Sequence, residues 1–177
     1  MMYFTEKDCR EYVNLRGGED GKRCGPRHIV LSESEKLLYI ITEYSNEILV
    51  YENRGAYRLL QKISTLPEGY TGDSNCSTLC FSKDRRFLYA ANRGADTVAL
   101  FSVKQDELLE RITEYYCGGK HPRHMIVTED GKRLIICNQQ SNLISVFALN
   151  LKTGEVNGKE TEYTFPAPSG ILELTAR

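Results

Sequence analysis

The chain contains a strand–turn–strand unit that occurs three times. In the central copy, the apolar segments 86–91 and 97–103 are joined by the turn Asn92–Asp96. A shift of 50 residues lays 38–51 onto this copy, and a shift of 46 residues in the other direction brings in 134–147. Such self-similarity is typical of repeat proteins, whose units bury their apolar faces only against neighbouring units.

Each unit is predicted to form four strands joined by short turns. In the first unit we expect strands near 25–32, 37–42, 48–51 and 57–63. The second strand of each unit is continuously apolar, as in strands that are covered on both faces. Helical periodicity is missing, and units of 46 to 50 residues resemble propeller blades in size. We therefore predict an all-β fold, a β-propeller of four-stranded antiparallel blades.

The chain is predicted to be a single partial propeller domain, 1–177, with about three and a half blades. Its last segment aligns Pro168 with Pro26 and Ile171 with Ile29, as if another unit were beginning. The expected parts are a remnant of a preceding blade at 1–24, blades at 25–73, 74–120 and 121–165, and the first strand of a further or closing blade at 166–177.

Composition excludes some classes of partner. The 23 basic and 24 acidic residues are dispersed without a basic block, so neither nucleic acid nor a membrane is an expected partner. No apolar run approaches the ~20 residues that span a bilayer, and the amino terminus lacks the layout of a secretory signal. We expect a cytoplasmic protein whose six cysteines are reduced thiols.

Polar residues are predicted to meet at one mouth of the propeller channel. The first strand of a blade leaves one end of the channel and the second returns, so the start of one and the end of the other share a rim. This geometry gathers three arginines, two histidines, a carboxylate and three amides: Arg27, His28, Glu43, Asn92, Arg93, Arg123, His124, Asn138 and Gln139. Guanidinium groups bind phosphate or carboxylate and stabilise a developing oxyanion.

Equivalent positions in the repeat carry an acid, a base and an amide, namely Glu43, Arg93 and Gln139. A repeated structural role would favour similar residues, so the variation indicates a shared site. Structural alternatives stay open for every type: arginines donating to carbonyls between blades, histidines as hydrogen-bonding residues, the glutamate pairing with Arg93, and asparagines in turns. The acidic residues are too few and too mixed with arginine for a metal site, and no cofactor is expected.

Several segments resemble the seven-bladed β-propeller lactonase family, which includes propeller-type 6-phosphogluconolactonases and fungal carboxymuconate cyclases. They occur in the family's order and run from about Gly25 to the end of the chain. The segments are Gly25–His28, Glu43 at 16 residues after Arg27, Ser64–Gly72, Asn92–Asp96, Pro122–His124 and Asn138–Ser141. Because only the later blades are represented, the resemblance implies an incomplete seven-bladed propeller.

The resemblance implies an acid/base group of Arg27, Glu43 and Arg93, with His28 as a further catalytic candidate. The implied activity is hydrolysis of a sugar-acid lactone, such as 6-phosphogluconolactone in the pentose phosphate pathway. The substrate-binding residues would be Arg123, His124, Asn92, Asn138 and Gln139. The family also uses a histidine from an earlier blade, which this chain lacks. The alternatives are a muconate-type lactonising cyclase and a non-catalytic fragment that serves as a binding surface.

The two end blades are each predicted to lack a neighbour. Their apolar second strands would then expose larger patches than monomers usually tolerate. We therefore expect self-association, or a partner that supplies the missing amino-terminal half.

Overall fold

The computed structural model describes residues 24–54 and 56–174, and they form three four-stranded antiparallel sheets. This arrangement confirms the predicted all-β partial propeller. Blade 1 consists of β1 (Pro26–Leu31), β2 (Leu37–Thr42), β3 (Glu47–Arg54) and β4 (Ala56–Ser64). Blade 2 consists of β5 (Asn75–Phe81), β6 (Phe87–Arg93), β7 (Thr97–Val103) and β8 (Leu109–Tyr116). Blade 3 consists of β9 (Pro122–Val127), β10 (Arg133–Asn138), β11 (Leu143–Leu149) and β12 (Val156–Thr164), with the short helix η1 (Gln139–Ser141) after β10.

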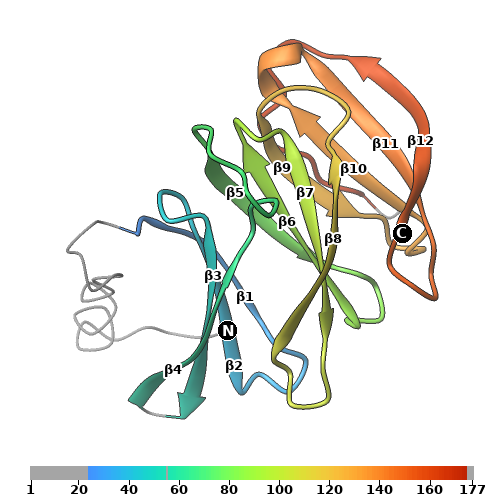
Figure 1. Ribbon diagram of the computed structural model, residues 1–177. Coiled ribbons are helices and arrows are strands. Elements are labelled where there is room, and N and C mark those ends of the chain that lie inside the picture. Colours follow the sequence, from blue (N-terminus) through green and yellow to red (C-terminus); the bar gives the residue numbers. More distant parts are fainter. Residues whose placement is uncertain (1–23, 55, 175–177) are drawn as a thin grey trace.

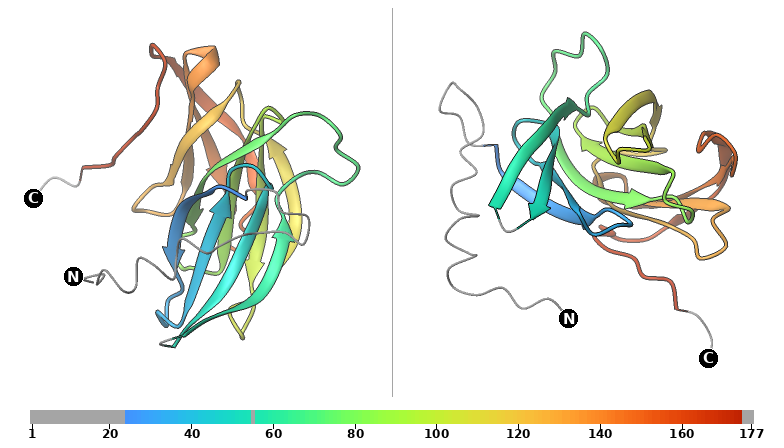
Figure 2. Two further views of the ribbon diagram at one scale, coloured as in Figure 1. Left: turned by 90° about the vertical axis from the view of Figure 1, so that its left-hand side faces the viewer. Right: turned by 90° about the horizontal axis from the view of Figure 1, so that it is seen from below.

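The blades lie side by side in chain order (Figure 1). Within each sheet the strands follow their order in the sequence, as in a meander. The first strands of successive blades contact one another, β1 against β5 and β5 against β9. The two further views show the same succession of sheets from the side and from below (Figure 2). The first strands therefore form the shared inner edge on which a site between blades can be built.

The core lies between the blades and is built by the apolar second strands. Tyr39 and Ile41 of β2 pack with Leu88 and Ala90 of β6 in the core between blades 1 and 2. The other face of β6, including Tyr89, packs against blade 3. All residues of β2 and of β6 are buried. Burial on both faces explains why these strands are continuously apolar instead of alternating with polar residues.

A repeated set of hydrogen bonds joins each blade to the next. The turn after the second strand holds Asn46, Asp96 or Asn142, each with a positive φ of 54 to 56°, which Asn and Asp tolerate better than most residues. The carbonyl oxygen of Asp96 accepts a bond from the Cys117 N–H at 3.0 Å. Its Oδ1 accepts a second bond, at 2.7 Å, from the N–H of His121 at the start of blade 3. The turn thereby sets where the next blade begins.

The first strand expected in residues 166–177 is not formed between 166 and 174. The segment nevertheless begins as the blades do: Asn142 Oδ1 accepts from the Ala167 N–H at 2.9 Å, and Pro168 is buried. The Ile171 N–H lies 3.4 Å from Nδ1 of His124. A strand needs a hydrogen-bonding partner, and no second strand follows in the described residues. The expected remnant at 1–24 lies outside the described residues, except for Cys24.

The outward faces of the two end blades differ. On blade 1, Leu38, Ile40 and Leu49 face away from blade 2 and are nevertheless buried. The expectation of an exposed apolar face is therefore wrong for this blade. On blade 3, Ile126 and Ile135 alternate with residues that pack against blade 2, and both are partly exposed. Self-association stays a prediction, and it rests on blade 3 alone.

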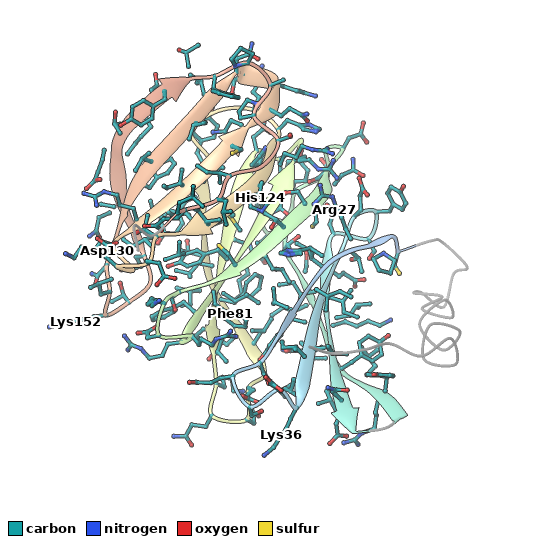
Figure 3. The ribbon with its side chains drawn as sticks, turned by 180° about the vertical axis from the view of Figure 1, so that it is seen from behind. Arg27, Lys36, Phe81, His124, Asp130 and Lys152 are labelled. Atoms are coloured by element: carbon teal, nitrogen blue, oxygen red, sulfur yellow. The ribbon has the colours of Figure 1, made fainter. Side chains whose placement is uncertain are left out.

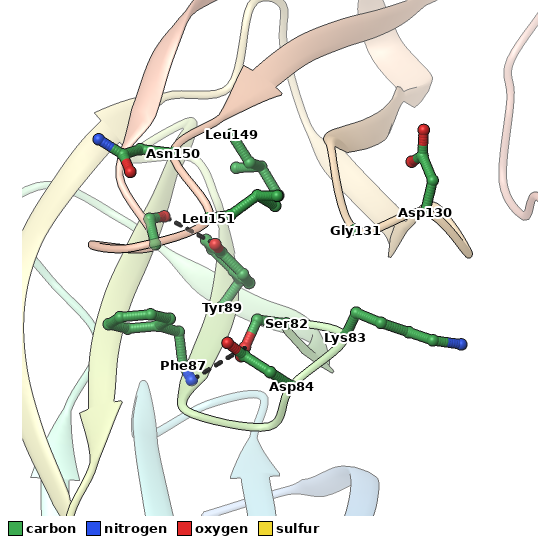
Figure 4. A pocket seen from close by; sticks show the side chains of 11 residues that line it. Ser82, Lys83, Asp84, Phe87, Tyr89, Asp130, Gly131, Leu149, Asn150 and Leu151 are labelled. Carbon is green, nitrogen blue, oxygen red and sulfur yellow. Dashed lines mark hydrogen bonds between the residues drawn. The ribbon is translucent and has the colours of Figure 1, made fainter.

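Two cavities of about 250 Å³ each lie between successive blades. Asp130 lines one and Phe81 the other, and Figure 3 shows both residues away from the end that carries Arg27. Each is lined by a tyrosine from the second strand, Tyr39 or Tyr89. The Tyr89 hydroxyl donates to the Gly154 carbonyl at 2.7 Å (Figure 4), and Tyr39 donates to the Glu107 carbonyl at 2.6 Å. These bonds tie the second strand of one blade to the loop before the last strand of the next.

We expect Tyr89→Phe to lower the free energy of unfolding by about 1 kcal/mol, because the Gly154 carbonyl loses its donor while the apolar packing stays. Chemical denaturation measures the change. Tyr116→Phe is the matched control, since the Tyr116 side chain is exposed and that substitution should leave stability unchanged. Equal stabilities of Tyr89→Phe and the parent would show that this hydrogen bond does not hold blades 2 and 3 together.

Candidate functional site

The charged residues predicted from the repeat come together at one rim of the inner edge. Arg27 lies near the start of β1, Arg93 ends β6, and Arg123 lies near the start of β9. Glu43 directly follows β2. The labelled residues Arg27 and His124 mark this end in Figure 3, whereas Lys36 and Asp130 mark the other. The meander geometry thus brings residues from three blades to one place.

Arg93 is the most firmly held of the three arginines, and its side chain is only 8% exposed. Its Nη2 donates to Glu43 Oε1 at 2.5 Å and to the Cys76 carbonyl at 2.8 Å. Its Nε donates to the Asn75 carbonyl at 3.2 Å. The pairing of Glu43 with Arg93 that was open from the sequence is therefore present. It links blade 1 to blade 2 and fixes the carboxylate at the rim.

Arg27 and Arg123 supply the positive charge of the rim that remains after Arg93 has paired with Glu43. Arg27 Nη1 donates to the Ser77 carbonyl of blade 2. The pKa of Arg27 is lowered, first by burial and then by the nearby positive charges of Arg93 and Arg123. Arg123 has no ion pair or hydrogen bond with the residues that the structure describes. A guanidinium without a partner, next to a second one, is suited to binding an anion.

His28 and His124 act as hydrogen-bond acceptors between blades. The Leu79 N–H donates to Nδ1 of His28 at 3.0 Å, and the Ile171 N–H lies 3.4 Å from Nδ1 of His124. Burial is the largest cause that lowers the pKa of both. A neutral imidazole whose Nδ1 accepts carries its proton on Nε2 and has no free nitrogen for a base. The contacts of His28 and His124 therefore fit the alternative in which both histidines are structural hydrogen-bonding residues.

Asn92 and Asn138 are completely buried. The Asn92 amide donates to the Thr65 carbonyl at 2.7 Å and to Thr97 Oγ1 at 3.1 Å, and its Oδ1 accepts from Thr65 Oγ1 at 2.7 Å. Asn138 donates to the Cys117 carbonyl and to Ser145 Oγ. Neither amide reaches solvent, so we leave both out of the site. Gln139 begins η1 at the rim and is partly exposed.

His121 also belongs to this rim, although it was not among the residues predicted from the sequence. Its φ is +62°, and Gly25 at the corresponding place in blade 1 has a φ of +69°. The equivalence follows from two matching bonds, Glu43 N–H to the Gly25 carbonyl and Gln139 N–H to the His121 carbonyl. Blade 1 has a glycine at this place, which suits the positive φ. The histidine in blade 3 is therefore a sequence signal that could have pointed to a role of its side chain.

The rim as a whole carries excess positive charge. The arginines of the three blades face two carboxylates, Glu43 on Arg93 and Asp96 on the backbone of His121. Within the described ranges, no group of three His, Cys, Asp or Glu side chains is placed to hold a metal ion. No helix in these ranges has the length and apolar character needed to cross a bilayer. The chemistry on offer is recognition of an anion and stabilisation of negative charge.

Comparison with known proteins identifies the family. Residues 5–172 match the family described as "Lactonase, 7-bladed beta-propeller". The chain belongs to this family. It is 32% identical over 151 residues to the 6-phosphogluconolactonase of Bacillus subtilis, an alignment that covers 81% of this chain and 42% of that protein. An uncharacterised protein of Staphylococcus aureus is 33% identical over 135 residues, which are 75% of this chain and 40% of that protein.

Solved structures agree with the family in fold. The periplasmic gluconolactonase of Pseudomonas aeruginosa superposes with a TM-score of 0.79 at 28% identity, over 83% of this chain and 42% of that one. A putative 6-phosphogluconolactonase from Bacteroides fragilis gives 0.74 at 25% identity, over 82% and 41%. The chain thus spans about two fifths of the length of its relatives. The expected likeness to propeller lactonases is confirmed.

The histidines predict how stability depends on pH. All three have a pKa below the usual 6.5, with burial as the largest cause. The unfolded chain then binds more protons than the folded chain below about pH 7, so the free energy of unfolding should fall as the pH falls from 7.5 to 5.5. Urea unfolding at intermediate pH values measures the slope. A free energy that is constant or rises over this range would contradict these pKa shifts.

Proposed function

We propose that the protein hydrolyses a sugar-acid lactone that carries an anionic substituent, with 6-phosphogluconolactone as the best candidate. The observation that supports this most directly is Arg123, a rim guanidinium without a partner among the described residues, beside Arg27 and Arg93. Membership of the lactonase family gives the reaction class, and the Bacillus subtilis relative suggests the phosphorylated substrate. Hydrolysis of that lactone would place the protein in the pentose phosphate pathway.

In this proposal the rim residues have separate roles. Arg123 binds the phosphate of the substrate, as a charge-assisted contact that is stronger than a neutral hydrogen bond. Arg27 polarises the lactone carbonyl and stabilises the oxyanion that forms when water attacks. Arg93 is occupied by Glu43 and two carbonyls, so it contributes its field and fixes the carboxylate. Gln139 borders the same rim.

The test compares hydrolysis of 6-phosphogluconolactone with hydrolysis of unphosphorylated gluconolactone. Loss of a charged contact is worth about 1.5–3 kcal/mol, so Arg123→Ala should lower kcat/KM for the phosphorylated lactone about 10- to 100-fold. Gluconolactone lacks the phosphate, and its kcat/KM should hardly change. Arg58→Ala is the matched control, because Arg58 is an exposed arginine of β4 that pairs with Glu52 away from the rim.

A parent protein that hydrolyses neither lactone faster than the spontaneous reaction would refute the proposed function. If Arg123→Ala lowered kcat/KM equally for both lactones, Arg123 would not bind the phosphate, but the proposed hydrolase activity would stand. Because 6-phosphogluconolactone hydrolyses spontaneously, the rate is measured as formation of 6-phosphogluconate above a blank without protein.

A further inference from the structure

We propose that His121 takes the proton from the attacking water in this hydrolysis, an inference that rests on the proposed function. His121 lies directly before β9, at the same rim as the three arginines. Neither of its ring nitrogens has a hydrogen-bond partner among the described residues, and the residue is partly exposed. It therefore has what a general base needs, a nitrogen lone pair that water can reach.

The other candidates for this role are already occupied. The chain has three histidines, and the Nδ1 atoms of His28 and His124 both face backbone N–H groups. Glu43 is bound to Arg93 at 2.5 Å. The Arg93 guanidinium thus engages this carboxylate and holds it in an ion pair. His121 is the remaining neutral base at the rim within the described residues.

The backbone holds His121 in place without using its ring. Its N–H donates to Asp96 Oδ1 at 2.7 Å, and its carbonyl accepts from the Gln139 N–H at 3.1 Å. Pro122 follows and limits the backbone on that side. The positive φ of +62° has no advantage for histidine over glycine. Because the backbone alone holds the residue and the ring makes no hydrogen bond to the described residues, the ring nitrogens are left for a use of their own.

The charges around His121 suit a base that works near neutral pH. The groups that face it are Arg93 at the end of β6, Asp96 in the following turn, Arg123 of β9 and Arg27 of β1. The three arginines lower its pKa and Asp96 raises it, while burial is the largest effect and lowers it. The imidazole is therefore neutral at pH 7 and able to accept a proton.

The proposed step balances without any further reagent. His121 accepts a proton from water as the water oxygen bonds to the lactone carbonyl carbon, and Arg27 stabilises the resulting oxyanion. Collapse of this intermediate breaks the bond between the carbonyl carbon and the ring oxygen. The imidazolium returns its proton to that oxygen, which becomes a hydroxyl group. The new carboxyl group releases its own proton to solvent, and the product is the open-chain hydroxy acid.

The test uses His121→Gly and His121→Asn, two residues that accept a positive φ, so that the turn is kept. A lost general base should lower kcat/KM for 6-phosphogluconolactone by about 100-fold or more. Added imidazole should restore part of the rate to His121→Gly, where it finds space, and a purely structural role would not give this rescue. In the parent, kcat/KM should fall as the pH drops below 6.5, and both variants should lose this dependence.

Lys120→Ala is the control, since it changes the neighbouring exposed residue and should keep the parent rate. Variants that retain the parent rate, or a loss that imidazole does not rescue, would overturn the role of His121. A separate measurement follows the His121 ring signals by NMR while 6-phosphogluconate is added. If the parent does not hydrolyse lactones, the proposed function falls. In that case, unmoved ring signals would also place His121 outside the site, whereas shifted signals would keep it there.

Discussion

Replacing Arg93 with alanine is expected to lower the free energy of unfolding by about 3 kcal/mol and to reduce kcat/KM for lactone hydrolysis by about 100-fold or more. The side chain is 8% exposed and donates to Glu43, Asn75 O and Cys76 O. The substitution leaves two carbonyls and a carboxylate without their donor. It also removes a positive charge from the rim and releases Glu43, which joins blade 1 to blade 2 there.

Glu43→Gln serves as the matched control for this prediction. Glu43 is 30% exposed, and Arg93 keeps both carbonyl partners when the carboxylate becomes an amide. We expect a stability loss of only about 1 kcal/mol, because solvent already screens much of the interaction. Denaturation curves and initial rates of both variants separate the contributions. If Arg93→Ala and Glu43→Gln cost the same stability, the ion pair rather than the carbonyl contacts would hold Arg93.

The fold could be predicted because it depends on features that repeat. Continuous apolar strands at spacings of 46 and 50 residues allow few arrangements other than stacked blades, and each copy supports the same reading. The same spacing located the rim, since strand direction alone decides where Arg27, Glu43 and Arg93 lie. The last segment keeps the pattern of a strand at Pro168 and Ile171 but forms no strand between 166 and 174, because a strand also requires a partner.

The roles of individual side chains could not be predicted in the same way. Whether His28 is a base or an acceptor depends on which N–H of the next blade lies opposite its Nδ1, and that follows from the stagger between blades. His121 was not predicted, because it lies just before the motif Pro122–His124. Its position matches Gly25 only when backbone hydrogen bonds define the equivalence. The repeat spacing therefore does not tell how neighbouring blades are staggered against each other.

Replacement of the buried Asn92 in blade 2 is the second prediction with a large effect on stability. The equivalent Asn138 in blade 3 is its matched control. Asn92 makes its four hydrogen bonds to Thr65 O, Thr65 Oγ1, Cys76 Sγ and Thr97 Oγ1. Asn92→Ala should lower the free energy of unfolding by about 4 kcal/mol, because it leaves several fully buried groups without partners and also creates a cavity. Thermal or urea unfolding of the purified variant measures this loss.

Asn138 occupies the equivalent place but lacks the donors for its Oδ1, which is buried without a partner among the described residues. Cys117 stands where Thr65 would donate its hydroxyl, and Pro122 replaces Cys76. Asn138→Ala removes this unpaired oxygen together with two hydrogen bonds, to Cys117 O and Ser145 Oγ. Its cost should therefore be about half that of Asn92→Ala. Equal costs would mean that Oδ1 of Asn138 has a partner in solution, for which a buried water is the natural candidate.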